Sequence, residues 1–272
     1  MLFRSKYASN GKDTVHLAYT DGHPRDFDNS IYHISYRQGV LYRSDGTAIR
    51  SLKEGLRTPE EGTLVYKGGA GNVALNCRSL NAKATLLTVT GDDADAQVLK
   101  ELFEKNGIGT SYMITSASRI TTNKMRIISR SQQMMRLDAE ITRDLDKEEE
   151  VRFLQQVKTY LDKEQPQVII LEDYNKGVLT DTVIRQVISW CKEKQIMVAV
   201  DPKRRNFFSY IGVDIFKPNL KEVKEALNIT AEGASEATMQ SIHQELSRQL
   251  NHQISFITLS ERGVFYQQGN EG

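Results

Sequence analysis

From about Lys67 onward the sequence alternates between short apolar segments and longer amphipathic ones, and this alternation most constrains the fold. The short segments are rich in Val and Ile and have the length of strands, whereas the longer ones repeat apolar residues at helical spacing. Strands and helices that alternate in this way build a parallel sheet covered by helices on both faces. The sequence therefore predicts an α/β fold, a three-layer α/β/α arrangement with a mostly parallel sheet. The expected strands are 84–90, 123–130, 168–172, 197–201, 215–217, 254–259 and 264–267, and the expected helices are 93–106, 147–164, 180–194, 220–227 and 236–250.

The first 66 or so residues follow another pattern. Short alternating runs at 13–20 and 30–37 predict strands, and Gln38-Gly39 predicts a tight hairpin into a further strand at 40–42. No amphipathic helix is apparent before Lys67. We therefore expect a β-rich segment over 1–66, packed outside the main sheet, and an α/β domain over 67–272.

Composition excludes several classes of protein. The 36 basic and 35 acidic residues nearly cancel, so the chain lacks the electrostatic signature of a nucleic-acid partner. Cys77 and Cys191 fall in helix-like stretches, which is typical of core residues in a reducing compartment. No run has membrane-spanning length and the N-terminus lacks a secretory pattern, so we expect a cytoplasmic protein without a membrane partner.

The stretch Gly68-Gly69-Ala70-Gly71-Asn72-Val73-Ala74 joins an expected strand to a helical pattern. Glycines at a helix start let the backbone approach a ligand and leave unpaired N–H groups facing it. With Asp92 about twenty residues on, the stretch fits a dinucleotide fingerprint. It also fits a sugar-binding loop, or a tight turn that binds nothing.

Basic residues crowd into the expected strands around 123–136. Lys124, Arg126 and Arg130 fall on one face of a strand and Arg136 follows, so several cations converge where a dianion such as a phosphate could sit. The alternative is an exposed strand that uses basic residues to protect its edge from aggregation.

Polar residues also follow three apolar strands, at the carboxyl ends where open α/β sheets bind ligands. Asp173 and Lys176 follow the first, and Lys203 follows the second just after Asp201. Asn219 and Glu222 follow the third, at the spacing of a helix capping box. The first and third groups also have a purely structural explanation, as a helix cap or its solvated neighbour.

Several of these motifs together resemble the PfkB (ribokinase) family of carbohydrate kinases over residues 67–272. The motifs are 68–76, 90–93 and the Asn219/Glu222 pair, and the segment 122–138 resembles the heptose 7-phosphate kinases of ADP-heptose and lipopolysaccharide synthesis. The resemblance implies a ribokinase-like fold, the cofactors ATP and Mg, a sugar-phosphate substrate and a possible homodimer. A dinucleotide-dependent enzyme would not account for the basic strands or for Asn219 and Glu222.

The resemblance also implies roles for individual residues. We expect Lys124, Arg126 and Arg136 to share one pocket with Asn72 and Lys176. Glu222 would act on Mg indirectly. The implied sugar-phosphate ligands are Gly68, Gly69, Asn72, Lys124, Arg126, Arg130, Gln133, Arg136, Asp173 and Lys176, and the implied nucleotide ligands are Lys203, Asn219, Glu222, Thr258 and Gly263.

Residues 1–66 resemble one to two blades of bacterial BNR (sialidase-like) β-propellers, in the runs 9–16, 20–26 and 31–34. A propeller normally needs at least four blades. His16, His23 and His33 lie within these runs, but their spacing fits no compact metal site.

The family's Gly-Ala-Gly-Asp element, whose aspartate is the general base, does not occur in the 272 residues, and Gly272 precedes its expected position. The family's opening strand is missing too. We therefore expect this polypeptide not to phosphorylate a sugar at a family-like rate, with Asp173 and Asp201 as weak stand-ins for the base. The alternatives are an inactive sugar-phosphate-binding or interaction module, or a chimeric gene product.

Overall fold

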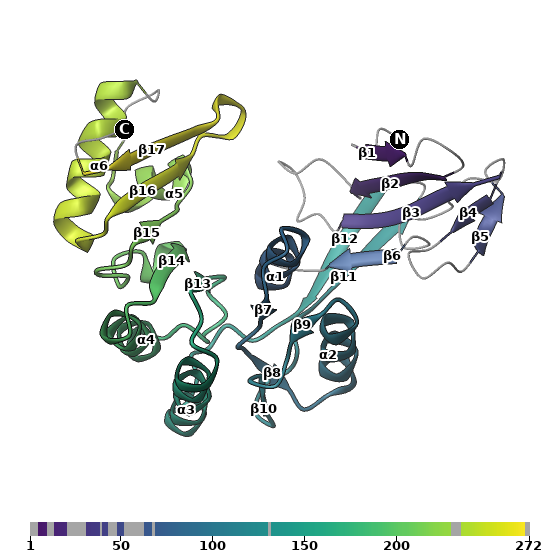
Figure 1. Ribbon diagram of the computed structural model, residues 1–272, viewed down its shortest axis with the longest axis horizontal. Helices are drawn as coiled ribbons and strands as arrows, with labels where there is room; N and C mark the ends of the chain where they lie inside the picture. The colour runs from purple at the N-terminus through teal and green to yellow at the C-terminus, as the bar shows by residue number, and fades with distance from the viewer. Residues whose placement is uncertain are drawn as a thin grey trace. The chain divides into compact units, whose positions relative to one another are not determined.

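The computed structural model describes residues 5–9, 14–20, 31–38, 40–42, 48–51, 63–66, 69–129, 132–229 and 235–269 (Figure 1). The chain divides into two compact units. Unit 1 comprises Met1–Ala84, Asn106–Ile108 and Asn123–Asp138, and unit 2 comprises Thr85–Lys105, Gly109–Thr122 and Ala139–Gly272. Each unit is described by itself.

Unit 1 contains an antiparallel sheet in the order β1-β2-β3-β4-β5. The strand β6 also pairs with β3, outside this order. The predicted hairpin turn is present, because Gln38 has a φ of 48° between β3 and β4. The helix α1 (Gly69–Ser79) and the paired strands β11 (Asn123–Ser129) and β12 (Gln132–Ala139) also belong largely to this unit. The sheet strands are β1 (Ser5–Ser9), β2 (Thr14–Thr20), β3 (Ile31–Arg37), β4 (Val40–Tyr42), β5 (Ala48–Ser51) and β6 (Thr63–Tyr66).

Unit 2 is built on a five-stranded sheet in the order β13-β14-β15-β16-β17 (Figure 1). The first four strands are parallel and β17 is antiparallel to β16, which confirms the predicted α/β class with a mostly parallel sheet. Two shorter strands, β8 and β10, form a separate parallel pair. The bounds are β8 (Val89–Gly91), β10 (Ile114–Ser116), β13 (Val168–Glu172), β14 (Met197–Asp201), β15 (Ile215–Phe216), β16 (Ile254–Thr258) and β17 (Val264–Gln268).

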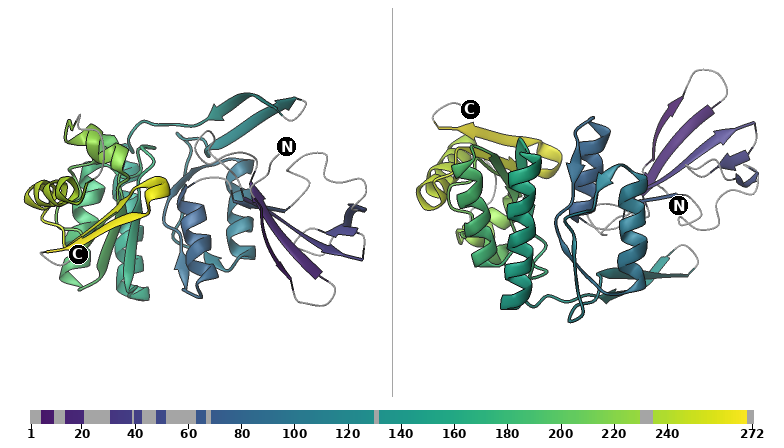
Figure 2. Two further views of the ribbon diagram at one scale, coloured as in Figure 1. Left: turned by 90° about the horizontal axis from the view of Figure 1, so that it is seen from above. Right: turned by 60° about the horizontal axis from the view of Figure 1, so that its bottom comes forward.

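Amphipathic helices bury one face of this sheet. Helices α3 and α4 lie side by side (Figure 2), and the apolar stripe of α4 includes Val183, Val187 and Cys191 at helical spacing. These side chains join Val198 and Phe216 of the sheet in one buried cluster. On the opposite face Val168, Ile170 and Met197 remain 40–47% exposed. The helices are α2 (Ala94–Lys105), α3 (Lys147–Glu164), α4 (Asp181–Glu193), α5 (Leu220–Ala226) and α6 (Glu236–Leu250).

Side-chain caps explain where several helices begin. Asp146 and Glu149 form a capping box at α3, and Asn219 and Glu222 form another at α5. Thr180 accepts from Val183 N at the start of α4. These bonds satisfy main-chain donors that have no partner inside the helix.

One predicted strand is wrong. Residues 84–90 were expected to form one strand, but the structure has β7 (Ala84–Thr85) and β8 (Val89–Gly91), separated by a non-strand stretch. The two strands pair differently, β7 with β9 (Ile108–Gly109) and β8 with β10. The break lets the chain change from one partner strand to another. The apolar sequence is continuous there, so it gives no sign that the strand is interrupted.

Residues 13–20 were expected to lie outside the parallel sheet, and β2 does form part of the antiparallel sheet of unit 1. In the described part of the chain no residue before Gly69 is helical, also as expected. No helix among the described residues is both long and apolar enough to cross a membrane. Cys77 and Cys191 are free thiols.

Candidate functional site

The carboxyl ends of the parallel strands in unit 2 bring together polar residues from four different elements. Glu172 ends β13 opposite Asp201 at the end of β14. Lys217 follows β15, and Asn219 forms a bridge to Thr258 at the end of β16. Parallel strands place their carboxyl ends at one edge of a sheet, so this grouping follows directly from the topology.

Five of the residues at this edge form what we call the Lys203 cluster, namely Asp201, Lys203, Asn219, Glu222 and Thr258. The Lys203 ammonium donates to Glu222 Oε1 at 2.5 Å and lies 3.5 Å from Asp201 Oδ1. Burial alone would lower the pKa of Lys203, but the hydrogen bond to Glu222 and the charge of Asp201 raise it above its usual value. Lys203 is therefore a fixed cation: its side chain stays protonated and is held in place by Glu222 and Asp201. This side chain is 30% exposed.

Glu222 serves the helix cap and the cluster at once. Its Oε2 accepts from Asn219 N at 2.8 Å, and Asn219 Oδ1 accepts from Glu222 N at 2.8 Å. Because the other carboxylate oxygen accepts from Lys203, both oxygens are engaged. The described residues contain no group of three or more His, Cys, Asp or Glu able to hold a metal ion. The indirect role of Glu222 toward magnesium stays a prediction.

Glu172 and Lys217 were not among the predicted site residues. Burial raises the pKa of the Glu172 carboxyl to about 7; the charge of Asp201 adds to this, while Lys217 and Lys203 oppose it. Lys217 Nζ donates to Asp201 Oδ2 at 2.7 Å. Glu172 ends β13 and Lys217 directly follows β15, and that position was the signal available in the sequence.

Asp173 is buried, with 2% of its surface exposed. Its Oδ2 accepts from the Tyr210 hydroxyl at 2.7 Å and from Asn206 Nδ2 at 3.2 Å, and its Oδ1 accepts from Asn175 N at 2.7 Å. Burial, together with the charge and hydrogen bond of Asp173, raises the pKa of Tyr210 well above its usual range. As placed, the carboxylate orders the turn after β13, and its role as a substrate ligand stays a prediction.

Lys176 lies in the same turn, and its ammonium donates to Glu140 Oε1 at 2.5 Å. Gly177 follows with a φ of 76°. A Cβ atom at Gly177 would lie 1.8 Å from the carbonyl oxygen of Arg143, so only glycine fits there. Leu145 N donates to the Gly177 carbonyl at 2.9 Å, which fixes the turn against the segment after β12.

The other predicted ligands are placed as follows. Gly69 begins α1 and Asn72 lies in its first turn, both partly buried in unit 1. Gly263 has a φ of 89° in the exposed turn between β16 and β17. Gly68 and the side chains of Lys124, Arg126, Arg130, Gln133 and Arg136 lie outside the described residues.

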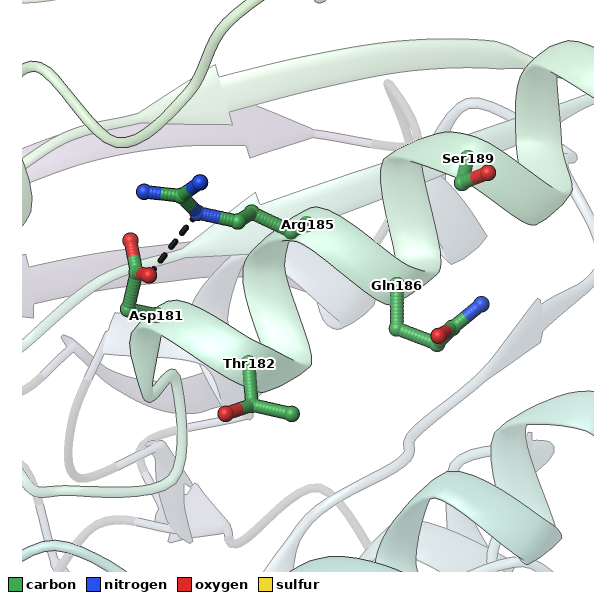
Figure 3. A pocket seen from close by; sticks show the side chains of 5 residues that line it. All are labelled: Asp181, Thr182, Arg185, Gln186 and Ser189. Carbon is green, nitrogen blue, oxygen red and sulfur yellow. Dashed lines mark ion pairs between the residues drawn. The ribbon is translucent and has the colours of Figure 1, made fainter.

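A surface depression of about 500 Å³ lies along α4 (Figure 3). All five lining side chains project from this one helix, and Arg185 pairs with Asp181 at 2.8 Å. None of the five is fully buried. A depression lined by a single solvent-exposed helix face lacks the converging polar groups of a ligand site.

Solved structures of small-sugar kinases share this architecture. Escherichia coli phosphofructokinase-2 in complex with potassium matches with a TM-score of 0.59 at 16% identity, covering 75% of this chain and 64% of that one. Giardia lamblia ribokinase matches with a TM-score of 0.59 at 16% identity, covering 75% and 62%. The fold is therefore ribokinase-like, as predicted.

Sequence comparison identifies the family. Residues 48–272 match the family model described as pfkB family carbohydrate kinase, and the chain belongs to that family. The protein named bifunctional protein HldE of Aliarcobacter butzleri is 36% identical over 197 residues, which cover 72% of this chain and 40% of that protein. The protein of the same name from Azorhizobium caulinodans is 35% identical over 201 residues, covering 74% and 41%. The chain thus spans about two fifths of the length of these curated relatives.

Proposed function

We propose that this chain binds ATP at the Lys203 cluster and a heptose 7-phosphate at the turn after β13, as a sugar-phosphate kinase. In the reaction a sugar hydroxyl oxygen would attack the γ-phosphorus. The bond from that phosphorus to the β,γ-bridging oxygen would break, releasing ADP, and the hydroxyl proton would pass to a base. The observation that carries the proposal is the Lys203 cluster, a fixed cation beside a capped helix start at the carboxyl edge of the sheet.

The nucleotide half of the proposal rests on charge. The Lys203 ammonium has three N–H donors. Glu222 Oε1 accepts one of them at 2.5 Å, and Asp201 Oδ1 accepts another at 3.5 Å. The third donor suits an oxygen of a polyphosphate. A magnesium ion bound with the nucleotide would neutralise phosphate charge, and Glu222 and Asp201 are the carboxylates that would orient its waters.

The sugar half rests on the turn after β13 and on the resemblance of β11 and β12 to the heptose 7-phosphate kinases. Lys176 offers a second ammonium, held by Glu140 and 28% exposed.

A second candidate is binding without phosphoryl transfer. The two aspartates at the strand ends already have partners. Asp173 accepts three hydrogen bonds, and Asp201 accepts from Lys217 and pairs with Lys203. A carboxylate whose lone pairs are occupied and whose charge is neutralised is a poor general base.

The first experiment measures ADP binding by isothermal titration calorimetry. Lys203→Gln removes one charge-assisted contact, so we expect affinity to fall by about 10- to 100-fold. The matched control is Lys221→Gln, because Lys221 lies on α5 with a side chain 85% exposed and should leave affinity unchanged. Equal ADP affinities of wild type and both variants would show that the nucleotide does not bind at this edge of the sheet.

The second experiment addresses the sugar and the chemistry. Heptose 7-phosphate should bind, whereas the heptose without phosphate should bind at least about tenfold more weakly, because a charged contact is lost. ATP consumption with heptose 7-phosphate then separates the two candidates. Turnover that disappears in Asp173→Asn or Asp201→Asn would make that aspartate the base and reject binding alone.

The cytoplasmic location and the homodimer expected from the sequence stay predictions. Size-exclusion chromatography with light scattering measures the second, and a single species at the mass of one 30.9 kDa chain would reject it.

A further inference from the structure

Arg119 is a buried arginine in the segment between β10 and β11, with 7% of its surface exposed. Its hydrogen bonds go to main-chain carbonyl oxygens. Nη2 donates to Lys176 O at 2.6 Å and to Ile141 O at 3.5 Å, and Nη1 donates to Arg143 O at 3.1 Å. A guanidinium presents its donors in a rigid plane, so one side chain can fix several carbonyls at once.

Those carbonyls belong to two segments that are distant in sequence. Ile141 and Arg143 follow β12, whereas Lys176 lies in the turn after β13. The segments also touch directly, through Leu145 N and the Gly177 carbonyl and through Lys176 Nζ and Glu140. Arg119 therefore binds the carbonyl of Lys176, and Glu140 binds its ammonium.

The segment that carries Arg119 is itself anchored. Thr121 N donates to Asp93 Oδ2 at 2.7 Å, and Arg143 Nη2 donates to Ser118 O at 2.8 Å. Asp93 also caps α2 by accepting from Ala96 N at 2.8 Å. The chain leading into β11 and the chain leaving β12 are thus tied together within unit 2, and Arg119 joins both to the turn of Lys176.

We propose that Arg119 is a positioning residue for sugar-phosphate binding, which acts by fixing Lys176 to the segment that follows β12. Arg119 itself does not touch the substrate, because its side chain is buried and three of its N–H donors are bonded to the backbone. The proposal rests on the proposed function, since it assigns Lys176 to the sugar phosphate. Glu140 supplies the second tie, to the Lys176 ammonium.

The test uses the full chain and three measurements on Arg119→Lys, which keeps the charge but loses the planar fork. Heptose 7-phosphate affinity should fall by about tenfold to a hundredfold, because a misplaced Lys176 ammonium loses much of a charge-assisted contact. ADP affinity should stay within about twofold of wild type, because the Lys203 cluster shares no hydrogen bond with Arg119. Hydrogen exchange should become faster at residues 141–146 and 174–178.

Arg152→Lys is the matched control, because exposed Arg152 donates to a single main-chain carbonyl, that of Thr115, at 3.1 Å. It should leave both affinities unchanged. If Arg119→Lys does not fold, Glu140→Gln removes the second tie and should show the same selective loss.

The outcomes separate the inference from the proposed function. Wild-type affinity for heptose 7-phosphate in Arg119→Lys would overturn the inference alone. Equal loss of both ligands would also overturn it, because a general structural defect would explain the result. A wild-type chain that binds no heptose 7-phosphate would overturn the proposed function and this inference with it, and normal ADP binding would show that the chain is folded.

Discussion

Two buried groups of unit 2 titrate with opposite effects on stability, so their contributions should cancel in the wild-type protein and appear separately in variants. His252 is 7% exposed, and its Nε2 lies 2.7 Å from Ser255 Oγ. The same hydroxyl lies 2.8 Å from Nδ1 of buried His243. Among the described residues, the buried His252 Nδ1 has no hydrogen-bond partner and neither imidazole has a carboxylate partner. A proton added here would therefore be an uncompensated buried charge.

The size of the His252 effect follows from its pKa. Burial lowers the pKa of His252 from 6.5 to about 4, and nearby His243 adds to this. The unfolded chain therefore binds the proton more readily, and stability is lost as pH falls below about 6.5. Linkage gives a loss of about 2 kcal/mol between pH 7.5 and pH 5. Burial also lowers the pKa of His243, which acts in the same direction.

Glu172 has the opposite sign. Its pKa is raised by burial from 4.5 to about 7, so the folded protein binds the proton more readily than the unfolded chain. Stability is therefore gained as pH falls through 7 toward 4.5. The same linkage relation gives a gain of about 2 kcal/mol between pH 7.5 and pH 5.

We expect wild-type stability to change by less than about 1 kcal/mol between pH 7.5 and pH 5, because the two effects offset each other. Glu172→Gln should leave the histidine effect, so this variant loses about 2 kcal/mol over that interval. His252→Gln should leave the Glu172 effect, opposed only by His243, and so gain up to about 2 kcal/mol. Urea unfolding measures this directly, since Trp190 is the sole tryptophan and lies on α4 in unit 2.

Glu225→Gln is the control, because Glu225 is an acid on α5 with a side chain 41% exposed. It should show the wild-type pH dependence. Only the change with pH is compared, so a general destabilisation by either substitution does not affect the conclusion. Parallel pH profiles of wild type, Glu172→Gln and His252→Gln would refute the reasoning about both groups.

Two further substitutions test the turn after β13 by the same urea measurement. Gly177→Ala should lower the free energy of unfolding by at least about 3 kcal/mol, because the new Cβ would lie 1.8 Å from Arg143 O. Gly263→Ala should cost only the backbone strain of about 1–3 kcal/mol, because a Cβ there would meet nothing within 4 Å. Equal costs would show that the backbone moves aside at Gly177. Tyr210→Phe should cost about 2 kcal/mol at pH 7, because Asp173 Oδ2 keeps only the longer bond from Asn206. A cost near zero would mean that the hydroxyl does not stabilise the carboxylate.

The longer elements of unit 2 could be predicted closely from sequence. Helices α3 and α6 and strands β13 and β14 have the predicted bounds. The two helices have a long apolar periodicity, and the two strands are apolar runs bounded by polar residues. Burial on one face requires both patterns. Strands β9 and β10 were not predicted, because two or three residues carry no periodicity.

Part of the candidate site followed from one rule, that parallel strands present their carboxyl ends together. That rule selected Asp201 and Lys203, and the structure places them in one cluster with Glu222. It could not select Arg119, whose partners are carbonyls at positions 141, 143 and 176. A main-chain acceptor leaves no trace in the identity of the residue, so such a contact appears only once the fold is known.

Glu222 shows why the structural and functional interpretations of a motif are not alternatives. The capping box with Asn219 is present, which confirms the structural interpretation, and the same carboxylate accepts from Lys203. Substituting Asn219 would remove a cap worth about 1 kcal/mol and would also release Glu222, so a loss of binding could come from either cause. Lys203 bonds to Glu222 Oε1, whereas the cap bonds use Glu222 Oε2, Glu222 N and Asn219, so its substitution leaves the donors and acceptors of the cap in place. The nucleotide-binding proposal is therefore tested at Lys203.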